Sequence, residues 1–449
     1  MEATAIRQAC DVGVPDTPKF ELDSPVSLIL KNMRFSPVAA WSAAVLLFLA
    51  PALNLIWRGG TGYCFFLLLA MALYAAVRNR HVSEYFSPLR EYPWYVAGMC
   101  ALLVAIIVQQ AIYGMWKPRQ FDAYSRFALA IPIFLMLRQM PARSFRAVGW
   151  GCAVGALVLG ALALLQRPAG GWTDADRLNN DYTNAIPYGD TALLLAFLSV
   201  FTIGWDGKYR KLAACLKLVA LIAGGFSSYS SGTRGGWVAI PFFLVMLGVQ
   251  YGWFANAKRL AVAGAIVVVA TVGLFSTPRI EQRVHDFSAD ISRLTNGDPN
   301  TSTGIRLELW RASVHLFTEH PVYGVGKGRL ESSMEQLSKQ GFMPELVVNE
   351  RAHSDFFSTL AESGAVGIVC LFAFYFGSTV YFWRRRRSTD PFIRTAAWSG
   401  MAVSASTIVF GLTIDVLVPI MVTVLVALLS AAFLAAIDAR EREISAAQR

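Results

Sequence analysis

The residues of this sequence best suited to chemistry are basic side chains next to apolar segments. Arg234 lies in the serine- and glycine-rich stretch SSYSSGTRGGW at 227–237, Arg306 begins an amphipathic segment, and His353 directly precedes an apolar run. A guanidinium group can bind a phosphate through two parallel hydrogen bonds, and a neutral imidazole can act as a general base. These three residues therefore predict two phosphate contacts and one proton acceptor.

Each of these residues also has a purely structural interpretation. Arg234 alone is typical of a helix start or a lipid-headgroup contact. Arg306 alone fits a salt bridge with Glu308 or Glu319, and His353 alone fits a capping or buried residue. The chemical hypothesis therefore depends on the three lying together at one surface.

One acidic pair suggests a metal site. Asp174 and Asp176 have the spacing of a DxD diphosphate–metal motif and lie in a polar loop at 167–184. So short a pattern is common by chance, and a solvated turn is the favoured interpretation. The six cysteines contain no CxxC pair, which disfavours a zinc site. Because arginines can neutralise a pyrophosphate without a cation, we predict that no metal is needed.

The elements that must position these residues are membrane helices. Of the 449 residues, 55% are hydrophobic and only 16% are charged, which is too little charge to cover a soluble protein of this size. The apolar runs are long enough to cross about 30 Å of hydrocarbon. We predict an all-α polytopic membrane protein with about twelve transmembrane helices, at 36–57, 60–77, 92–113, 122–138, 145–166, 185–205, 211–227, 235–253, 259–275, 355–383, 393–412 and 417–437.

Positive charge predicts the orientation of these spans. Lys and Arg are concentrated in the short loops on the side of the N-terminus, as in the run Arg384–Arg387, and such loops face the cytoplasm. The net charge of +10 is therefore a topology signal and gives no reason to invoke nucleic acid. The predicted divisions are a cytoplasmic tail without a cleavable signal peptide at 1–35, spans one to nine at 36–275, an outer loop at 276–354, spans ten to twelve at 355–437 and a cytoplasmic tail at 438–449.

The outer loop is predicted to be a folded cap. Residues 305–319 have helical periodicity and are followed by Pro321 and several glycines, and 328–340 reads as a second short helix. Ser354 or Asp355 can cap the next span, whose positive N-terminal end favours a neutral His353. The apolar face predicted for the first helix consists of Ile305, Leu309, Ala312 and Leu316 with Trp310, Ser313, Val314 and Phe317.

At these residues the sequence resembles the O-antigen ligase family (WaaL), within the Wzy-C superfamily. Three segments carry the resemblance: SSGTRGG at 230–236, STGIRLELWRASVHLFTEHPVYGVGKG at 302–328 and AHSDFFSTLAESGAVG at 352–367. The layout from residue 36 to 437 is also similar, but outside the three segments the match is one of hydropathy only.

The resemblance implies a GT-C-like glycosyltransferase of the bacterial inner membrane. Such a ligase moves O-antigen polysaccharide from undecaprenyl pyrophosphate to the lipid A–core of lipopolysaccharide, on the periplasmic face and without a nucleotide cofactor. The matching positions imply a catalytic His353, pyrophosphate binding by Arg234 and Arg306, and substrate contacts by Arg177 and Asp415. The stretch RLNNDYTNAIPYGD, which begins at Arg177, departs from the family pattern.

Three other functions compete with the ligase. A protein O-oligosaccharyltransferase uses the same donor with a Ser or Thr acceptor, and an O-antigen polymerase uses lipid-linked glycan on both sides, so sequence separates neither from a ligase. A transporter of lipid-linked glycan would place ionisable residues or broken helices at the bilayer midplane. The predicted mid-span positions are nearly free of charge, which disfavours transport.

Overall fold

The computed structural model describes residues 36–78, 85–173, 175–207, 209–258, 301–344 and 351–449, with a few isolated positions between 260 and 293. Within these residues the regular structure is helical, apart from one isolated bridge between Asn180 and Thr183. The predicted tail at 1–35 lies outside the described residues, as does most of the predicted span at 259–275 and of the loop before residue 301.

Each of the other predicted spans contains a helix. These are α2 (Pro37–Ala52), α3 (Gly60–Arg78), α5 (Pro93–Ile112), α6 (Asp122–Leu137), α7 (Arg146–Leu165), α8 (Ala185–Phe201), α9 (Arg210–Ser230), α10 (Ala239–Gln250), α15 (Asp355–Gly377) with α16 (Thr379–Arg385), α17 (Pro391–Gly411) and α18 (Ile420–Ala447). Counted with adjoining turns, 7 helices of the described chain are long and apolar enough to cross a membrane. The polytopic all-α class is thus confirmed, whereas the number of twelve spans and their orientation stay predictions.

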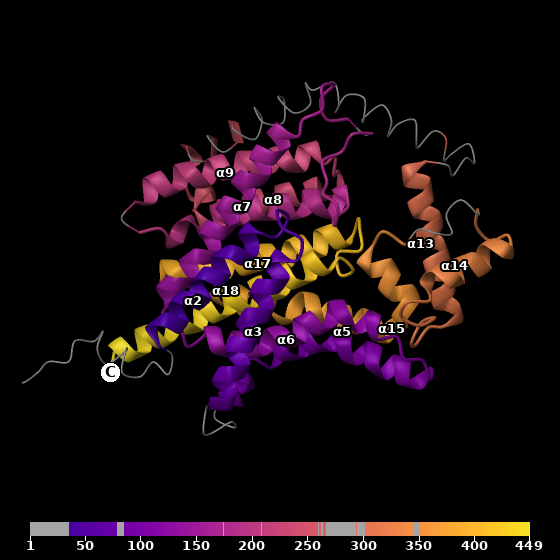
Figure 1. Cartoon of the computed structure of the whole chain (residues 1–449), viewed down its shortest axis with the longest axis horizontal. Coiled ribbons are helices and arrows are strands. Elements are labelled where there is room, and N and C mark those ends of the chain that lie inside the picture. The colour runs from indigo at the N-terminus through magenta and orange to yellow at the C-terminus, as the bar shows by residue number, and fades with distance from the viewer. Residues whose placement is uncertain are drawn as a thin grey trace, which may run out of the picture.

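Helices α8 and α18 form the centre of the bundle. Their apolar stretches are 94% and 89% buried, so other helices must cover them on every side. Helix α8 packs against α7, α9 and α17, and α18 packs against α3, α6 and α17 (Figure 1). Because lipid does not drive apolar helices together, close backbone contact matters. A methyl group at Gly160 of α7 would lie 2.5 Å from the Cβ of Ala223 in α9.

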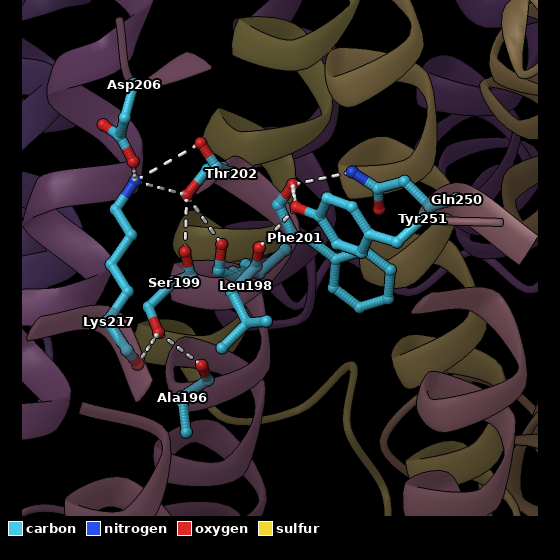
Figure 2. Close-up of polar contacts among 10 residues, drawn as sticks. Ala196, Leu198, Ser199, Phe201, Thr202, Asp206, Lys217, Gln250 and Tyr251 are labelled. Carbon is cyan, nitrogen blue, oxygen red and sulfur yellow. Dashed lines mark hydrogen bonds and ion pairs between the residues drawn. The ribbon is translucent and has the colours of Figure 1, made fainter. Parts of the chain in front are cut away.

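The end of the bundle where α8 and α18 terminate and α17 begins, which we name the basal end, is closed by buried ion pairs. Lys217 of α9 is 1% exposed, and its Nζ lies 2.7 Å from Asp206. The same ammonium group donates to Thr202 at the end of α8 (Figure 2). Arg138 donates from two nitrogens to the carboxylate of Asp438 in α18, at 2.7 and 2.9 Å. Each of these four charges therefore faces a buried opposite charge.

The opposite end, which we name the cap end, is covered by two loop helices (Figure 1). They are α13 (Ser302–Glu319) and α14 (Leu330–Lys339), and they confirm the two helices predicted in the outer loop. Val314, which was predicted to be on the apolar face, is instead 42% exposed, because that side of α13 turns away from the core. The core between the loop helices and α15 consists of Leu309, Ala312, Leu316, Leu330, Met334, Leu337, Met343 and Ala361.

Helix α15 is broken at Gly364, where the sequence predicted one continuous span. Gly364 has φ 59° and ψ −154°, a conformation that glycine adopts without the steric cost other residues meet. The break frees backbone groups on both sides, and loop residues 321–326 bond to them. Ala365 N donates to Pro321 O at 2.9 Å, and Val325 N donates to Ala361 O at 2.9 Å. Irregular backbone in a membrane protein is tolerated where protein groups satisfy it in this way.

We name residues 321–328 and 361–366 together the loop–helix joint, and Gln109 of α5 completes it. The Gln109 side chain is 2% exposed, and its Nε2 donates to Tyr323 O and, at 2.6 Å, to Glu362 O. Its Oε1 accepts from Lys327 N at 2.9 Å. The outer loop is thus fixed to two membrane helices, α5 and α15, at the cap end.

Candidate active site

His353 lies between the outer loop and α15, in an unusual backbone conformation. It is the one residue other than glycine in the described ranges with positive φ, at 50°. Such a conformation costs on the order of 1–3 kcal/mol and persists where surrounding contacts impose it. One of these contacts is the hydrogen bond from Trp310 Nε1 to Ala352 O, at 2.9 Å. The Trp310 ring also stacks on Phe357 of α15, with 4.8 Å between ring centroids.

Ser354 and Asp355 bind elsewhere than predicted. Ser354 occupies the N-cap position of α15, but its side chain makes no capping hydrogen bond and donates instead to Gly411 O at 3.2 Å. Asp355 accepts at 3.1 Å from the backbone N–H of Leu417. Both side chains therefore attach the His353 segment to the end of α17 and to the connection that precedes α18.

Arg306 and Arg234 come together at the cap end. Arg306 lies one turn before Trp310 on α13, and Arg234 precedes the short 3₁₀ helix Gly235–Val238. Burial lowers the pKa of Arg306, and the positive charge of Arg234 lowers it further. A guanidinium group whose charge is disfavoured by a neighbouring cation is stabilised by an anion placed beside it. The two arginines are therefore close enough to interact electrostatically, and their joint binding of a ligand stays a prediction.

The proposed salt bridges of Arg306 are replaced by other pairs. Glu308 lies 3.7 Å from Arg311, and Glu319 lies 3.4 Å from His315. The two carboxylates that would have given Arg306 a structural role thus have other side-chain neighbours on the same helix. The charge interaction that the structure identifies for Arg306 is the electrostatic effect of Arg234.

The glycine-rich segment before and after Arg234 is held by α8 and by the connection between α17 and α18. Thr233 Oγ1 donates to Ala185 O at 3.0 Å. A methyl group at Gly235 would lie 2.2 Å from Thr413 Oγ1, and one at Gly236 would lie 2.1 Å from Asp190 Oδ1. The close approaches that these glycines allow in the structure are therefore to protein groups.

Arg177 supports the same segment. Its Nε donates to Ser231 O at 2.7 Å, and the next residue, Leu178, donates from its backbone N–H to Ser230 O at 3.1 Å. The side chain is half-buried. Arg177 therefore contacts the backbone of the glycine-rich segment that contains Arg234, which we name the Arg234 loop.

Asp415 lies in the connection between α17 and α18 and is 6% exposed. Its Oδ2 is 3.5 Å from Nε of Arg351, which lies two residues before His353. Thr413 of the same connection touches Gly235, next to Arg234. Asp415 thus links the His353 segment to the Arg234 loop.

Four further charged residues lie at the cap end and were not predicted from the sequence. Arg351, Lys327 and Glu362 form a buried cluster with Asp415. Asp190 of α8 is 3% exposed, and neither of its carboxylate oxygens has a hydrogen-bond partner within the described part of the chain. A signal was available for two of them, because Asp190 and Glu362 are acids inside apolar runs, where charge is costly and often functional.

A small cavity adjoins Asp190, between α8, α17 and α18. Its lining includes Thr191, Thr407, Phe410 and Val416, and its volume is about 10 Å³. A cavity of that size holds about one water molecule, and a sugar or a lipid chain does not fit.

No group of three or more metal-ligating side chains is present in the part of the chain that the structure describes. Of the DxD pair, Asp174 lies outside the described residues. Asp176 is exposed and donates from its backbone N–H to Thr173 Oγ1 at 3.0 Å, which is the geometry of a turn. Metal independence remains part of the proposal below.

A known protein family matches the segment that contains several of these residues. The family described as O-antigen ligase (Wzy-C) matches residues 218–372, which include Arg234, Arg306 and His353 and leave out Arg177 and Asp415. An uncharacterized protein of Haemophilus influenzae is 27% identical over 269 residues. That match covers 59% of this chain and 66% of the relative. The resemblance to the O-antigen ligase family of the Wzy-C superfamily is therefore confirmed, with residues 218–372 as the segment that carries it.

Proposed function

We propose that the protein is an O-antigen ligase of the bacterial inner membrane. It would transfer O-antigen polysaccharide from undecaprenyl pyrophosphate to a sugar hydroxyl of lipid A–core, at a site on the periplasmic face. The observation that carries the proposal is that Arg234, Arg306 and His353 all lie inside the segment that matches the O-antigen ligase family. The charge of Arg234 also acts on Arg306, so the two guanidinium groups lie in one electrostatic environment. A pyrophosphate is the anion for which such a pair is suited, because each guanidinium can bind phosphate oxygens through two hydrogen bonds.

The reaction would proceed by direct displacement at the anomeric carbon. The acceptor hydroxyl oxygen forms a bond to that carbon as the bond to the pyrophosphate oxygen breaks, so the configuration inverts. His353 takes the hydroxyl proton, and Arg234 and Arg306 stabilise the charge that develops on the leaving pyrophosphate. Because pyrophosphate is already a good leaving group, the reaction needs neither a general acid nor, in this proposal, a metal.

The transporter alternative gains no support from the charged residues inside the candidate spans. Asp190, Lys217 and Glu362 each lie within about two turns of a helix end. Of these, Lys217 is neutralised by Asp206 and Glu362 by Lys327. The charges thus lie toward the two ends of the bundle, whereas a transport pathway requires them at mid-membrane.

The test is transfer by purified protein in detergent, with undecaprenyl-pyrophosphate glycan, lipid A–core and EDTA. Product should form in the presence of EDTA, and product only in its absence would contradict the metal-free mechanism. Arg234→Ala should raise the KM of the donor more than that of the acceptor. Arg119→Ala, which removes an exposed arginine of the α5–α6 connection, is the matched control and should change neither.

The acceptor class is tested in a strain that lacks the gene. Loss of polymer from lipid A–core, with lipid-linked polymer still made, is the expected result for a ligase. Loss of glycan from a periplasmic protein would instead assign a protein O-oligosaccharyltransferase, and loss of polymer length would assign a polymerase.

A further inference from the structure

Glu362 is the centre of a buried charge cluster at the cap end. Its side chain is fully buried, in the part of α15 that precedes the break at Gly364. It accepts from Lys327 Nζ at 2.5 Å, from Gly328 N at 3.0 Å and from Arg351 at 3.3 Å. One carboxylate thus receives three donors from two separate loop segments.

Arg351 connects this cluster to the candidate active site. Its guanidinium lies between Glu362, at 3.3 Å, and Asp415, at 3.5 Å. His353 follows two residues later, so the position of Arg351 limits where the imidazole can lie. The chain from Glu362 through Arg351 therefore reaches both the proposed base and the connection between α17 and α18.

Lys327 balances the charge of the cluster. It is 6% exposed and belongs to the loop–helix joint, where Gln109 accepts from its backbone N–H. Lys327 and Arg351 supply two positive charges against the carboxylates of Glu362 and Asp415. Buried ion clusters of this kind are weak contributors to stability, because desolvation offsets much of their attraction. A role in fixing geometry explains the cluster better than a role in stability does.

We propose that Glu362 is a positioning residue of the transfer reaction, which acts through Arg351 to hold His353 and Asp415 in their reactive arrangement. This inference rests on the proposed function, since it assigns the same site. The donor contacts come from other elements, α13 and the Arg234 loop. Loss of Glu362 should therefore slow the chemical step and leave donor binding unchanged.

The test compares Glu362→Gln, Arg351→Met and the double variant Glu362→Gln/Lys327→Met with wild type. Glu362→Gln should lower kcat by about ten- to a hundredfold, as expected for a catalytic group displaced by about 1 Å. The KM for the donor should stay within about twofold. Adding Glu362→Gln to Arg351→Met should cause no further loss of kcat, because Glu362 acts through Arg351.

The double variant separates positioning from charge balance. Glu362→Gln alone leaves Lys327 as a buried uncompensated cation, and Lys327→Met removes that charge. The melting temperature should then return toward the wild-type value while kcat stays low. Recovery of both would overturn the proposal, because Glu362 would then serve only to neutralise Lys327.

A second readout does not depend on the reaction. The rate at which diethyl pyrocarbonate modifies His353, measured by peptide mass spectrometry, should change at least threefold in Glu362→Gln. It should stay at the wild-type rate in Asp206→Asn, which breaks the buried Lys217 ion pair at the basal end. An unchanged rate in both variants overturns the positioning role. Absence of transfer by the wild-type protein would count against the ligase and leave this second readout to decide the role of Glu362.

Discussion

The two ends of the helical bundle differ in how they treat buried charge. The basal end pairs the charges described above, whereas the cap end combines the paired cluster around Glu362 with two residues, Arg306 and Asp190, in a different situation. At the basal end, Lys217 and Arg138 each meet a carboxylate at 2.7 Å. At the cap end, burial lowers the pKa of Arg306, and the like charge of Arg234 lowers it further. Asp190 has two carboxylate oxygens without hydrogen-bond partners in the described chain.

This difference indicates what each end is built for. A buried charge that already has an opposite charge beside it is little stabilised by a ligand. A buried charge without such compensation is stabilised when a ligand of opposite charge binds. The basal end therefore behaves as a structural closure. The cap end contains Arg234, Arg306 and His353, which lie inside the family-matched segment, and this difference supports the proposal that the cap end binds the substrate.

The largest expected effect, and the sharpest test of the difference between the two ends, comes from removing the proposed base. His353→Ala should lower kcat by about 10²–10⁴-fold, the usual contribution of general base catalysis. The melting temperature should change little, because the side chain is half-buried and the helices keep their contacts. Turnover and thermal unfolding of the purified variant check this, and a variant with wild-type turnover would show that His353 is no base.

The basal end should respond in the opposite sense. Asp206→Asn leaves Lys217 as a buried charge without its carboxylate, which should cost about 3–5 kcal/mol of stability. The activity of the protein that remains folded should match wild type. Thermal unfolding and turnover per folded molecule measure the two effects. The surface pair Lys339–Glu335 on α14 is the control, because Glu335→Gln should cost under about 1 kcal/mol.

Arg306→Met should sharpen the contrast at the cap end. It removes a charge that its surroundings disfavour, so the melting temperature should stay equal or rise. The kcat/KM for the donor should nevertheless fall by about 10²-fold, as when one electrostatic contact to a leaving group is lost. Inorganic pyrophosphate should raise the melting temperature of wild type more than that of the variant. An equal rise in both would argue against a pyrophosphate contact.

The smallest effect is expected from Trp310→Phe. The change removes the hydrogen bond to Ala352 O and keeps an aromatic ring against Phe357. The loss of about 1 kcal/mol should appear as a several-fold decrease in kcat. Measured turnover with an unchanged donor KM would support a role for α13 in placing His353. A decrease in donor affinity alone would assign Trp310 to the arginine side of the site.

The sequence predicted the features that depend on local periodicity. Hydropathy located the membrane helices, and helical spacing located α13 and α14, because burial on one face leaves a regular pattern. The sequence also predicted that Arg234 and Arg306 lie near each other, and the electrostatic effect of Arg234 on Arg306 agrees with this, while their role as a phosphate site stays a prediction.

The features that sequence analysis missed depend on contacts far apart in the chain. The break at Gly364 is stabilised by hydrogen bonds to residues 321–326, which no local pattern reveals. The cluster around Glu362 is similarly joined across distant segments. Val314 was placed on an apolar face by spacing alone, but tertiary packing turned it to the surface.

The loop–helix joint also has a consequence for biosynthesis. Gln109 is made with α5, yet its hydrogen bonds reach Tyr323, Lys327 and Glu362, more than 200 residues later in the chain. During synthesis these bonds cannot form until the C-terminal half has entered the membrane. The cap end should consequently be the last part of the molecule to assemble, so a defect in the joint would yield a chain that is inserted and stable but lacks the proposed activity.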